Sequence, residues 1–293
     1  MRTSLDCIPC FVRQALTAAR MVSADSAVHE LIVREVLHWV SEMSWEEPPP
    51  AFGQRIHRRL REIVRSADPY RNAKDQQNRM AMSLLPELEA RIEAAADPLI
   101  VALRLAIAGN VIDMGPTGNV TESAMRESIC QALTTPLVGD EQGFREAVNE
   151  AHRILYLADN AGEIALDRLL VEQLAPARVT VAVRGAPVIN DATMADARAV
   201  GLHEIVEVID NGSDAPGTLL GECSPEFMRR FTEADLILAK GQGNFETLSN
   251  QPGNIIFLFK AKCPVIATQA GVPIGAHVLI RSQTGNMRSG GAS

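Results

Sequence analysis

The sequence lacks the features that mark membrane-spanning, secreted and disulfide-stapled proteins. No apolar run is long enough to cross a bilayer as a helix. The first ten residues, MRTSLDCIPC, contain no apolar core of a secretory signal. The five cysteines are an odd, sparse set in 293 residues and do not form a disulfide framework. We therefore expect a protein of the reducing cytoplasm with no membrane partner.

Several catalytic motifs are absent as well. There is no G-x-S-x-G elbow and no P-loop, and the six histidines form no H-x-x-x-H pair. A zinc hydrolase is therefore disfavoured. A formal net charge of -8 and a pI of about 5.3 argue against a nucleic-acid partner. An anionic substrate would need local cations to offset this charge, and a bound metal is one way to supply them.

The chain is predicted to have an N-terminal helical subdomain over residues 1–150. Apolar residues recur at helical spacing in CIPCFVRQALTAARMV, and SWEEPPP interrupts the pattern because prolines break helices. A helix follows in DPYRNAKDQQNRMAMSLLPELEARI, with Tyr70, Lys74 and Asn78 on one face. A strongly apolar helix in DPLIVALRLAIAG should be central to a core.

Residues 151–282 are predicted to form an α/β domain, because short apolar runs alternate with helical patterns. Five strands are predicted in RILYLAD, RVTVAVRG, EIVEVID, DLILAKG and NIIFLFKAK, and PVIATQAG and HVLIRS are read as two more. This rhythm predicts a doubly wound, mostly parallel sheet with helices on both faces. The small, polar tail over residues 283–293 is expected to be disordered.

Ligands of open parallel sheets bind beyond the carboxyl ends of the strands, so the residues at these ends indicate what the protein could bind. Acids and amides follow the first three strands, in DNAGE, RGAPVIND and DNGSD, and lysines end the fourth and fifth. Carboxylate and amide oxygens are hard ligands that suit Mg²⁺ or Mn²⁺, and an ammonium suits a phosphate oxygen. A metal and a lysine facing one crevice is the arrangement that phosphoryl transfer needs.

Each of these residues also has a purely structural explanation. Asp159 to Gly162 after a strand form a natural turn and helix cap, and Asp191 has the position of an N-cap. The glycines after Lys240 can serve backbone geometry alone, and Lys260 can be a surface residue. The functional interpretation depends on these residues coinciding at adjacent strand ends.

The chain resembles the damage-control phosphatases, a metal-dependent family formerly known only as a domain of unknown function. The matching stretches are CIPCFVRQAL, DPYRNAKDQQNRMA, GNVIDMG, LADNAGEIALD, RGAPVINDATMADA, AKGQGNFETL and FLFKAKCPVIA. They are spread from Cys7 to Ala267, so the resemblance extends over nearly the whole chain. The N-terminal Cys-x-x-Cys points to the smaller prokaryotic branch. The resemblance implies hydrolysis of small sugar phosphates or damaged phosphometabolites with Mn²⁺, Mg²⁺, Co²⁺ or Ni²⁺.

The resemblance also implies roles for particular residues. Asp159, Asn160 and Asp191 would bind the metal, with Asp159, Asp191 and Lys240 as the catalytic set. Residues assigned to the substrate are Asn110, Asp113, Glu163, Asn244 and Lys260. Relatives with an Arg-Thr-x-Lys motif carry an arginine where this chain has Phe257, so this chain lacks the side chain for any contact made by that arginine.

Several points stay open from the sequence. Water or an aspartate could be the nucleophile, and Glu163 and Asp196 are acid-base candidates through sequence proximity alone. The alternatives are a metal-independent, methyltransferase-like transferase and a non-enzymatic metal or redox module built on Cys7 and Cys10. Structural packing of these two cysteines is favoured, although Cys263 would give a third thiol if it came close in space. The sequence predicts no oligomeric state.

Overall fold

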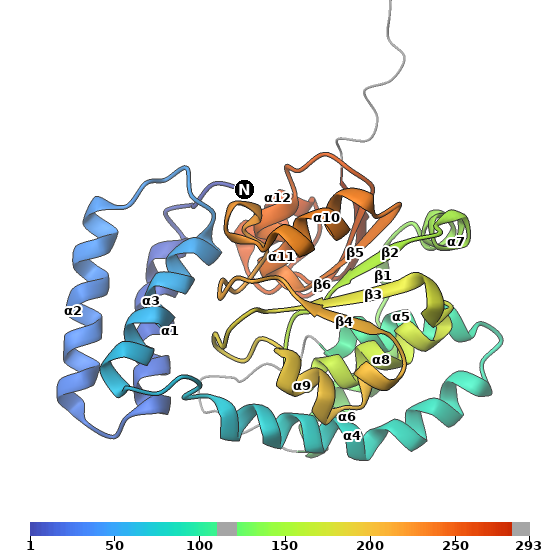
Figure 1. Cartoon of the computed structure of the whole chain (residues 1–293), viewed down its shortest axis with the longest axis horizontal. Helices are drawn as coiled ribbons and strands as arrows, with labels where there is room; N and C mark the ends of the chain where they lie inside the picture. Colours follow the sequence, from blue (N-terminus) through green and yellow to red (C-terminus); the bar gives the residue numbers. More distant parts are fainter. Residues whose placement is uncertain (110–121, 283–293) are drawn as a thin grey trace, which may run out of the picture.

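A computed structural model describes residues 1–109 and 122–282. Asn110 and Asp113, which were assigned to the substrate, lie outside these ranges, as does the predicted tail at 283–293. The described part of the chain has a helical N-terminal region followed by one mixed α/β sheet (Figure 1). This confirms the predicted α/β class.

Three helices form a separate group beside the sheet, coloured blue in Figure 1. They are α1 (Cys7–Val22), α2 (Ser26–Glu42) and α3 (Pro49–Val64). Asp25 caps α2 by accepting a hydrogen bond from the backbone N–H of Ala27. Helix α2 ends at Glu42, before SWEEPPP, and the prolines of this segment begin the next helix. Pro49 and Pro50 occupy the first turn of α3, where a missing N–H has no cost. Phe11, Ile32 and Ile56 are among the buried residues that join these helices into a small core.

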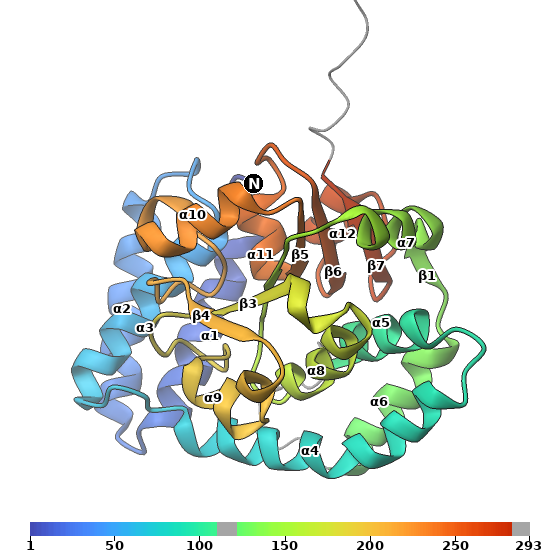
Figure 2. The same cartoon turned by 45° about the vertical axis from the view of Figure 1, so that its right-hand side comes forward.

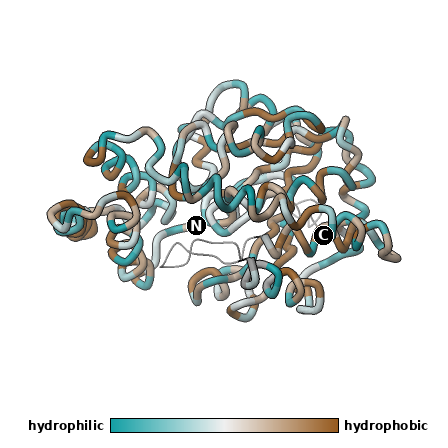
Figure 3. Tube along the Cα trace, turned by 90° about the horizontal axis from the view of Figure 1, so that it is seen from below, coloured by the Kyte–Doolittle hydropathy of each residue, from teal (hydrophilic) through white to brown (hydrophobic). Residues whose placement is uncertain are grey.

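The next three helices pack against the sheet. They are α4 (Arg71–Glu93), α5 (Pro98–Gly109) and α6 (Glu122–Thr134). The long helix α4 runs along the outside of α8 (Glu163–Gln173) and α9 (Met194–Ala199) and contacts both (Figure 2). Its first half buries polar side chains, and its second half buries the apolar residues Ala81, Leu84, Leu85, Leu88 and Ile92. Figure 3 colours the trace by hydropathy, and hydrophilic and hydrophobic stretches alternate along it.

Seven strands of the described residues form one sheet, in the order β1-β7-β6-β5-β2-β3-β4. Strands β2 to β6 run parallel, whereas β7 is antiparallel to β6 and β1 is parallel to β7. The strands are β1 (Leu137–Gly139), β2 (Ile154–Leu157), β3 (Val179–Val183), β4 (Glu207–Asp210), β5 (Leu236–Lys240), β6 (Ile255–Lys260) and β7 (His277–Arg281). The carboxyl ends of β2 to β6 therefore meet at one edge.

Helices cover both faces of the sheet, as predicted. Tyr156, Val181 and Leu238 project to one face and pack with α4, α5 and α8. Leu157, Phe257 and Phe259 project to the other and pack with α10, α11 and α12. The remaining helices are α7 (Glu141–Glu150), α8 (Glu163–Gln173), α9 (Met194–Ala199), α10 (Pro225–Glu233), α11 (Gly241–Leu248) and α12 (Pro264–Ala270). The fully buried strands explain the continuous apolar runs of the sequence.

Two local expectations are wrong. PVIATQAG, read as a strand, is helix α12, since Pro264 occupies its first turn and Gly271 ends it with a left-handed φ of 68°. The sequence over residues 121–151 predicts a polar helix, a loop and a second helix, but the segment between α6 and α7 contains β1, which pairs with β7. The proposed division of the chain at about residue 150 stays a prediction. No helix within 1–109 or 122–282 combines the length and apolar character that a bilayer span requires.

An ionic cluster joins the N-terminal helices to the sheet. Asp214, in the loop after β4, accepts hydrogen bonds from Arg58 at 2.6 Å and from Gln54 at 2.8 Å, and it pairs with Arg61. Partial burial opposes ionisation of Asp214, but these partners lower its pKa to about 2. Helix α3 is thereby fixed over the loops at the carboxyl edge.

This cluster should make the fold sensitive to acid. Because the pKa of Asp214 is lower in the folded state, its contribution is complete above the unfolded pKa near 4 and is lost as the pH falls towards 2. Allowing for the exposed side of Arg58, we expect it to be worth about 1–2 kcal/mol. Urea unfolding of the parent and of Asp214→Asn should differ by this amount at pH 7 and converge below pH 3. An equal difference at both pH values would contradict the prediction.

Candidate active site

A cavity of about 760 Å³ lies between α1 and the carboxyl edge of the sheet. The sheet side contributes Asp159, Asn160 and Asp191. The helical side contributes Gln14 from α1 and His57 from α3. The lining also includes Cys7, Cys10, Phe11, Arg13, Ile189, Asn190, Gln242, Glu246, Lys262 and Cys263. Helices α1 and α3 therefore provide the second wall of this cavity. An ordinary doubly wound sheet has no such helices.

Asp159 and Asn160 are positioned by the sharp turn after β2. Gly162 adopts a φ of 75° there, and its N–H donates to Asn78 of α4 at 2.7 Å. Backbone pairing then joins this turn to the loop after β3, because Asn160 and Asp191 form an isolated antiparallel bridge. The N–H of Ala192 also donates to the carbonyl of Asp159 at 2.7 Å. The two segments, distant in sequence, are therefore held side by side.

The guanidinium of Arg184, at the end of β3, lies between the two aspartates. Its Nε donates to Asp191 at 2.7 Å, and its Nη2 lies 3.7 Å from Asp159 Oδ1. Burial raises the pKa of Asp159 well above its usual range, and the carboxylates of Glu163 and Asp191 raise it further. Two carboxylates thus face one cation in a largely buried setting, which is the arrangement that an additional cation would stabilise.

Lys240 lies behind this group, fully buried at the end of β5. Its Nζ donates to Asp167 at 2.6 Å and to the carbonyl of Ala106 at 2.8 Å, and it pairs with Glu163. Burial alone would lower the pKa of Lys240, but the two carboxylates raise it above its ordinary value. These three acceptors match the three donors of an ammonium group. In this structure Lys240 therefore points into the protein, towards α8 and α5.

Glu163 connects Lys240 to the cavity. Its Oε2 accepts a hydrogen bond from Asn160 Nδ2 at 3.2 Å, and the same amide donates to Asp159 Oδ2 at 3.0 Å. A continuous chain of contacts therefore runs from Lys240 through Glu163 and Asn160 to Asp159. This chain fixes the amide of Asn160 against the carboxylate of Asp159.

Tyr70, Lys74 and Asn78, on one face at the start of α4, make polar contacts with Asp196 and His57 next to the site. Lys74 Nζ lies 2.9 Å from Asp196, which caps α9, and Asn78 donates to the same carboxylate at 2.9 Å. Tyr70 bonds His57 at 2.7 Å. The four-residue spacing seen in the sequence therefore corresponds to a row of buried polar contacts. Asp196 is occupied in this row, since its pKa is lowered by Lys74 and Thr193 in spite of burial.

A family model for the damage-control phosphatase ARMT1-like domain matches residues 3–278. The chain belongs to this family. It is 34% identical over 287 residues to a damage-control phosphatase of Archaeoglobus fulgidus, covering 95% of this chain and 98% of the relative. It is 33% identical over 292 residues to an uncharacterised protein of Methanocaldococcus jannaschii, covering 94% of each. A crystal structure of a DUF89 family protein from Pyrococcus horikoshii superposes with a TM-score of 0.87 at 32% identity, covering 97% of this chain and all of that one.

As a member of the damage-control phosphatases, the chain carries its predicted site residues in three settings. Asp159, Asn160 and Asp191 line the cavity together. Glu163 and Lys240 are buried behind them in the ion-pair network. Asn244 is buried beside Arg184, where it accepts from Thr218 at 2.8 Å and donates to the carbonyl of Lys240 at 2.7 Å.

Lys260 is placed apart from this cavity. It pairs in register with His277 of β7, whose pKa is lowered to about 4 by burial and by the charges of Lys260 and Arg104. Lys262, two residues further, lines the cavity, and its charge acts on Asp159. Because side chains alternate along a strand, residues 240 and 260 project to the α5 side of the sheet while the loop after β6 returns Lys262 to the edge.

Reasoning from the sequence missed Arg184, Asn190 and Lys262 as site residues. Arg184 and Lys262 stand at predicted strand ends, and Asn190 lies in the loop after Arg184, so the signal was available. Only the fold shows that Arg184 lies between the two aspartates and that Asn190 and Lys262 line the same cavity. The three thiols of Cys7, Cys10 and Cys263 line one wall of the same cavity. Within the described ranges, no group of three or more His, Cys, Asp or Glu residues has the geometry of a metal site.

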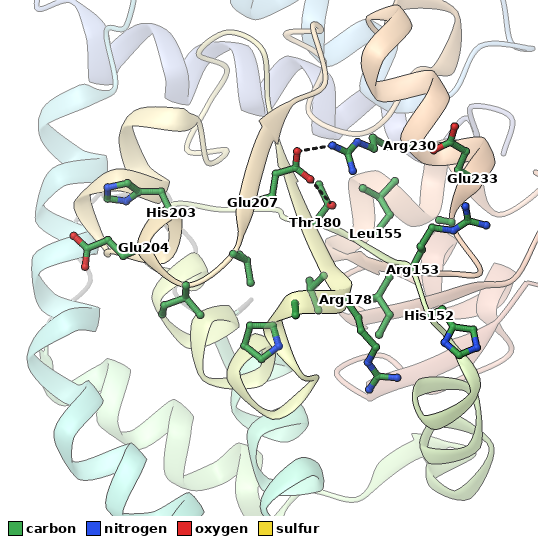
Figure 4. A pocket seen from close by; sticks show the side chains of 17 residues that line it. His152, Arg153, Leu155, Arg178, Thr180, His203, Glu204, Glu207, Arg230 and Glu233 are labelled. Atoms are coloured by element: carbon green, nitrogen blue, oxygen red, sulfur yellow. Dashed lines mark hydrogen bonds and ion pairs between the residues drawn. The ribbon is translucent and has the colours of Figure 1, made fainter.

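A second cavity, of about 530 Å³, lies at the opposite edge of the sheet (Figure 4). It opens at the amino ends of β2, β3 and β4. Arg230 forms an ion pair with Glu207 there, and Arg178 donates to the carbonyl of Ala151 at 2.7 Å. Ligands of parallel sheets bind at the carboxyl edge, so the cavity at Asp159 is the candidate active site.

Gly241 is required at the start of α11, directly after β5, where the backbone comes close to Asp159. It adopts a φ of 78°, and a Cβ atom there would lie 1.9 Å from Asp159 Oδ2. We expect Gly241→Ala to displace this carboxylate and lower turnover at least about tenfold, besides costing about 1 kcal/mol through backbone strain. Gly271→Ala is a matched control, because Gly271 has a φ of 68° with nothing within 4 Å. Equal loss of activity in both variants would show that strain alone is responsible.

Proposed function

We propose that this chain is a divalent-metal-dependent phosphatase of small phosphomonoesters, such as sugar phosphates or damaged phosphometabolites. Family membership supports a phosphatase role in metabolite repair, and the metal and substrate are the parts proposed here. One observation carries the proposal. Asp159 and Asp191 follow different strands, and both face the buried guanidinium of Arg184. They lie at the wall of a cavity large enough for a metabolite.

The donor set fits a hard divalent cation. Asp159, Asn160 and Asp191 offer two carboxylates and an amide oxygen, the ligand types that Mg²⁺ and Mn²⁺ prefer. The raised pKa of Asp159 adds an electrostatic reason, since nearby carboxylates that repel each other are stabilised by a shared cation. The metal, when bound, would supply positive charge that polarises the phosphoryl group.

The surrounding residues would prepare this site. Arg184 orients the two aspartates, and Glu163, itself held by Lys240, orients Asn160. Lys262 is the lysine of the described residues best placed to offset the charge of a phosphate, because it lines the cavity and its charge reaches Asp159. We therefore assign Lys240 a positioning role and Lys262 the electrostatic role.

The helical wall would enclose the rest of the substrate. Gln14 and His57 are polar groups of this wall, and Gln242 of α11 lines the same cavity. Burial together with Arg61 lowers the pKa of His57 to about 3, so that it is neutral at pH 7. Neutral hydrogen-bonding groups opposite a phosphate site suit the hydroxyl groups of a sugar phosphate. A second charged group on the substrate would find less support there.

The test is phosphate release by the purified protein. A panel of sugar phosphates and p-nitrophenyl phosphate would be assayed with Mn²⁺, Mg²⁺, Co²⁺ or Ni²⁺, and after removal of metal with EDTA. We expect release with at least one metal and loss of release with EDTA, restored by adding the metal back. No release with any metal, or full activity in EDTA, would refute the proposal.

A further inference from the structure

Asn190 directly precedes Asp191 in the cavity wall and has an unsatisfied hydrogen-bond donor. Its side chain is 3% exposed, and it lines the cavity next to Asp191. The buried Nδ2 has no hydrogen-bond partner among the residues described here. Buried polar groups are rarely left unpaired, because the lost contact with water is not replaced. Because the residue lines the cavity, a small rotation of its side chain would turn this donor towards the cavity, where a ligand can supply the missing partner.

The backbone next to Asn190 is strained, and its hydrogen bonds fix the position of this residue. Ile189 has a φ of 42°, in the left-handed region that a β-branched residue seldom adopts. The peptide is held on both sides, since the carbonyl of Asn190 accepts from Ala161 at 2.7 Å and the N–H of Asp191 donates to Val188 at 3.0 Å. Such conformations persist only where the surroundings impose them, and they concentrate at functional sites.

The chemistry of the neighbours points to an anionic oxygen as the missing acceptor. Asp159 and Asp191 already accept from Asn160 and Arg184. A lysine in place of Asn190 would pair with these carboxylates and compete with a bound cation, whereas a neutral amide can donate to an oxyanion without doing so. Hydrogen bonds to ionised acceptors are also the stronger kind.

We propose that the side-chain amide of Asn190 is a hydrogen-bond donor to a non-bridging phosphoryl oxygen of the substrate. This rests on the proposed function, and it adds a substrate-binding residue to that site. Asn190 would hold the phosphoryl group beside the two aspartates. The fixed backbone at Ile189 would keep the residue at the cavity wall before the substrate arrives, so that only the side chain has to turn. The same contact would bind inorganic phosphate as product.

The experiment measures inorganic phosphate binding by calorimetry at saturating Mn²⁺, together with kcat/KM on the best ester of the panel. The variants are Asn190→Ala, which removes the donor, and Asn190→Asp, which keeps the shape and replaces the donor by an acceptor. We expect Asn190→Ala to weaken phosphate binding by about tenfold to a hundredfold, and Asn190→Asp by at least as much. Asn254→Ala is the matched control, because Asn254 precedes β6 at the opposite edge and also has an unpaired buried side-chain atom.

The outcomes separate this proposal from the proposed function. Phosphate binding that depends on Asn190, without turnover of any ester, would support the contact and refute the enzyme. Turnover with phosphate binding within twofold of the parent in both variants would refute the contact and leave the enzyme. The Mn²⁺ affinity of Asn190→Ala should stay within about twofold of the parent. A loss of Mn²⁺ binding equal to the loss of phosphate binding would overturn the assignment to phosphate.

Discussion

Replacing Asp159 by asparagine should abolish phosphatase turnover while leaving the fold at least as stable as the parent. In the proposed site Asp159 supplies one of two carboxylates to the metal, and the charge stabilisation lost with it is about 4 kcal/mol, or roughly a thousandfold in rate. The stability expectation has a different cause. Burial and the carboxylates of Glu163 and Asp191 disfavour the charge on Asp159, so its neutral replacement relieves repulsion when no metal is bound.

Asp191→Asn should lose activity to a similar degree but should also lose stability. Asp191 accepts from the Nε of Arg184 at 2.7 Å, and the variant leaves this buried guanidinium without its best partner. Breaking a buried ion pair on one side costs about 3 kcal/mol or more. Both variants should lose activity, but only Asp191→Asn should lose stability. The comparison therefore shows that Asp191 stabilises the fold and that the charge on Asp159 destabilises it.

Thermal unfolding with and without Mn²⁺ measures both effects. Bound metal stabilises the folded state by mass action, so the parent should gain several degrees and Asp159→Asn should gain none. Asp235→Asn is the control, since Asp235 binds the backbone of Arg153 at the opposite edge of the sheet at 2.9 Å. An Asp159→Asn enzyme that keeps a tenth or more of the parent turnover would contradict the metal role of this residue.

The sequence predicts the strands and their ends better than it predicts the elements that pack around them. The alternation of apolar runs and amphipathic segments places β2 to β6. A parallel strand that is buried on both faces must be almost continuously apolar, so its sequence is easy to distinguish. PVIATQAG failed because a short apolar run has no distinguishing period, and the capping signals of Pro264 and Gly271 outweigh it. Strand β1 has only three residues and depends on its pairing with β7.

The candidate site shows the same division. Asp159 and Asp191 were found because each follows a strand and the topology brings strand ends together. Arg184 was visible at a strand end, but its burial between two acids depends on the bridge between Asn160 and Asp191. The choice between Lys260 and Lys262 needed the path of the loop after β6. The second wall of the cavity could not be predicted, since no local pattern says where α1 packs.

Replacing Lys240 by methionine should cause the largest loss of stability among these variants. Methionine fills a similar volume without charge, so Glu163 and Asp167 would be left buried and without their ammonium partner. The pKa of Asp167 is already raised to about 6 by burial, in spite of Lys240. Loss of one partner of a buried ion pair costs about 3–5 kcal/mol, and the melting temperature should fall by about 10 °C.

A double-mutant cycle with Asp167→Asn tests whether this loss comes from the buried charges. Tyr156 also donates to Asp167, at 2.8 Å, so the neutral variant keeps a hydrogen-bond partner. If the uncompensated carboxylates are the cause, Lys240→Met should cost less in the Asp167→Asn background, with a coupling of about 1–3 kcal/mol. The alternative is that Lys240 acts directly on the phosphate. In that case Lys240→Met would melt at the parent temperature and lose only turnover, because a lysine that contacts substrate has no reason to support Glu163 in the free protein.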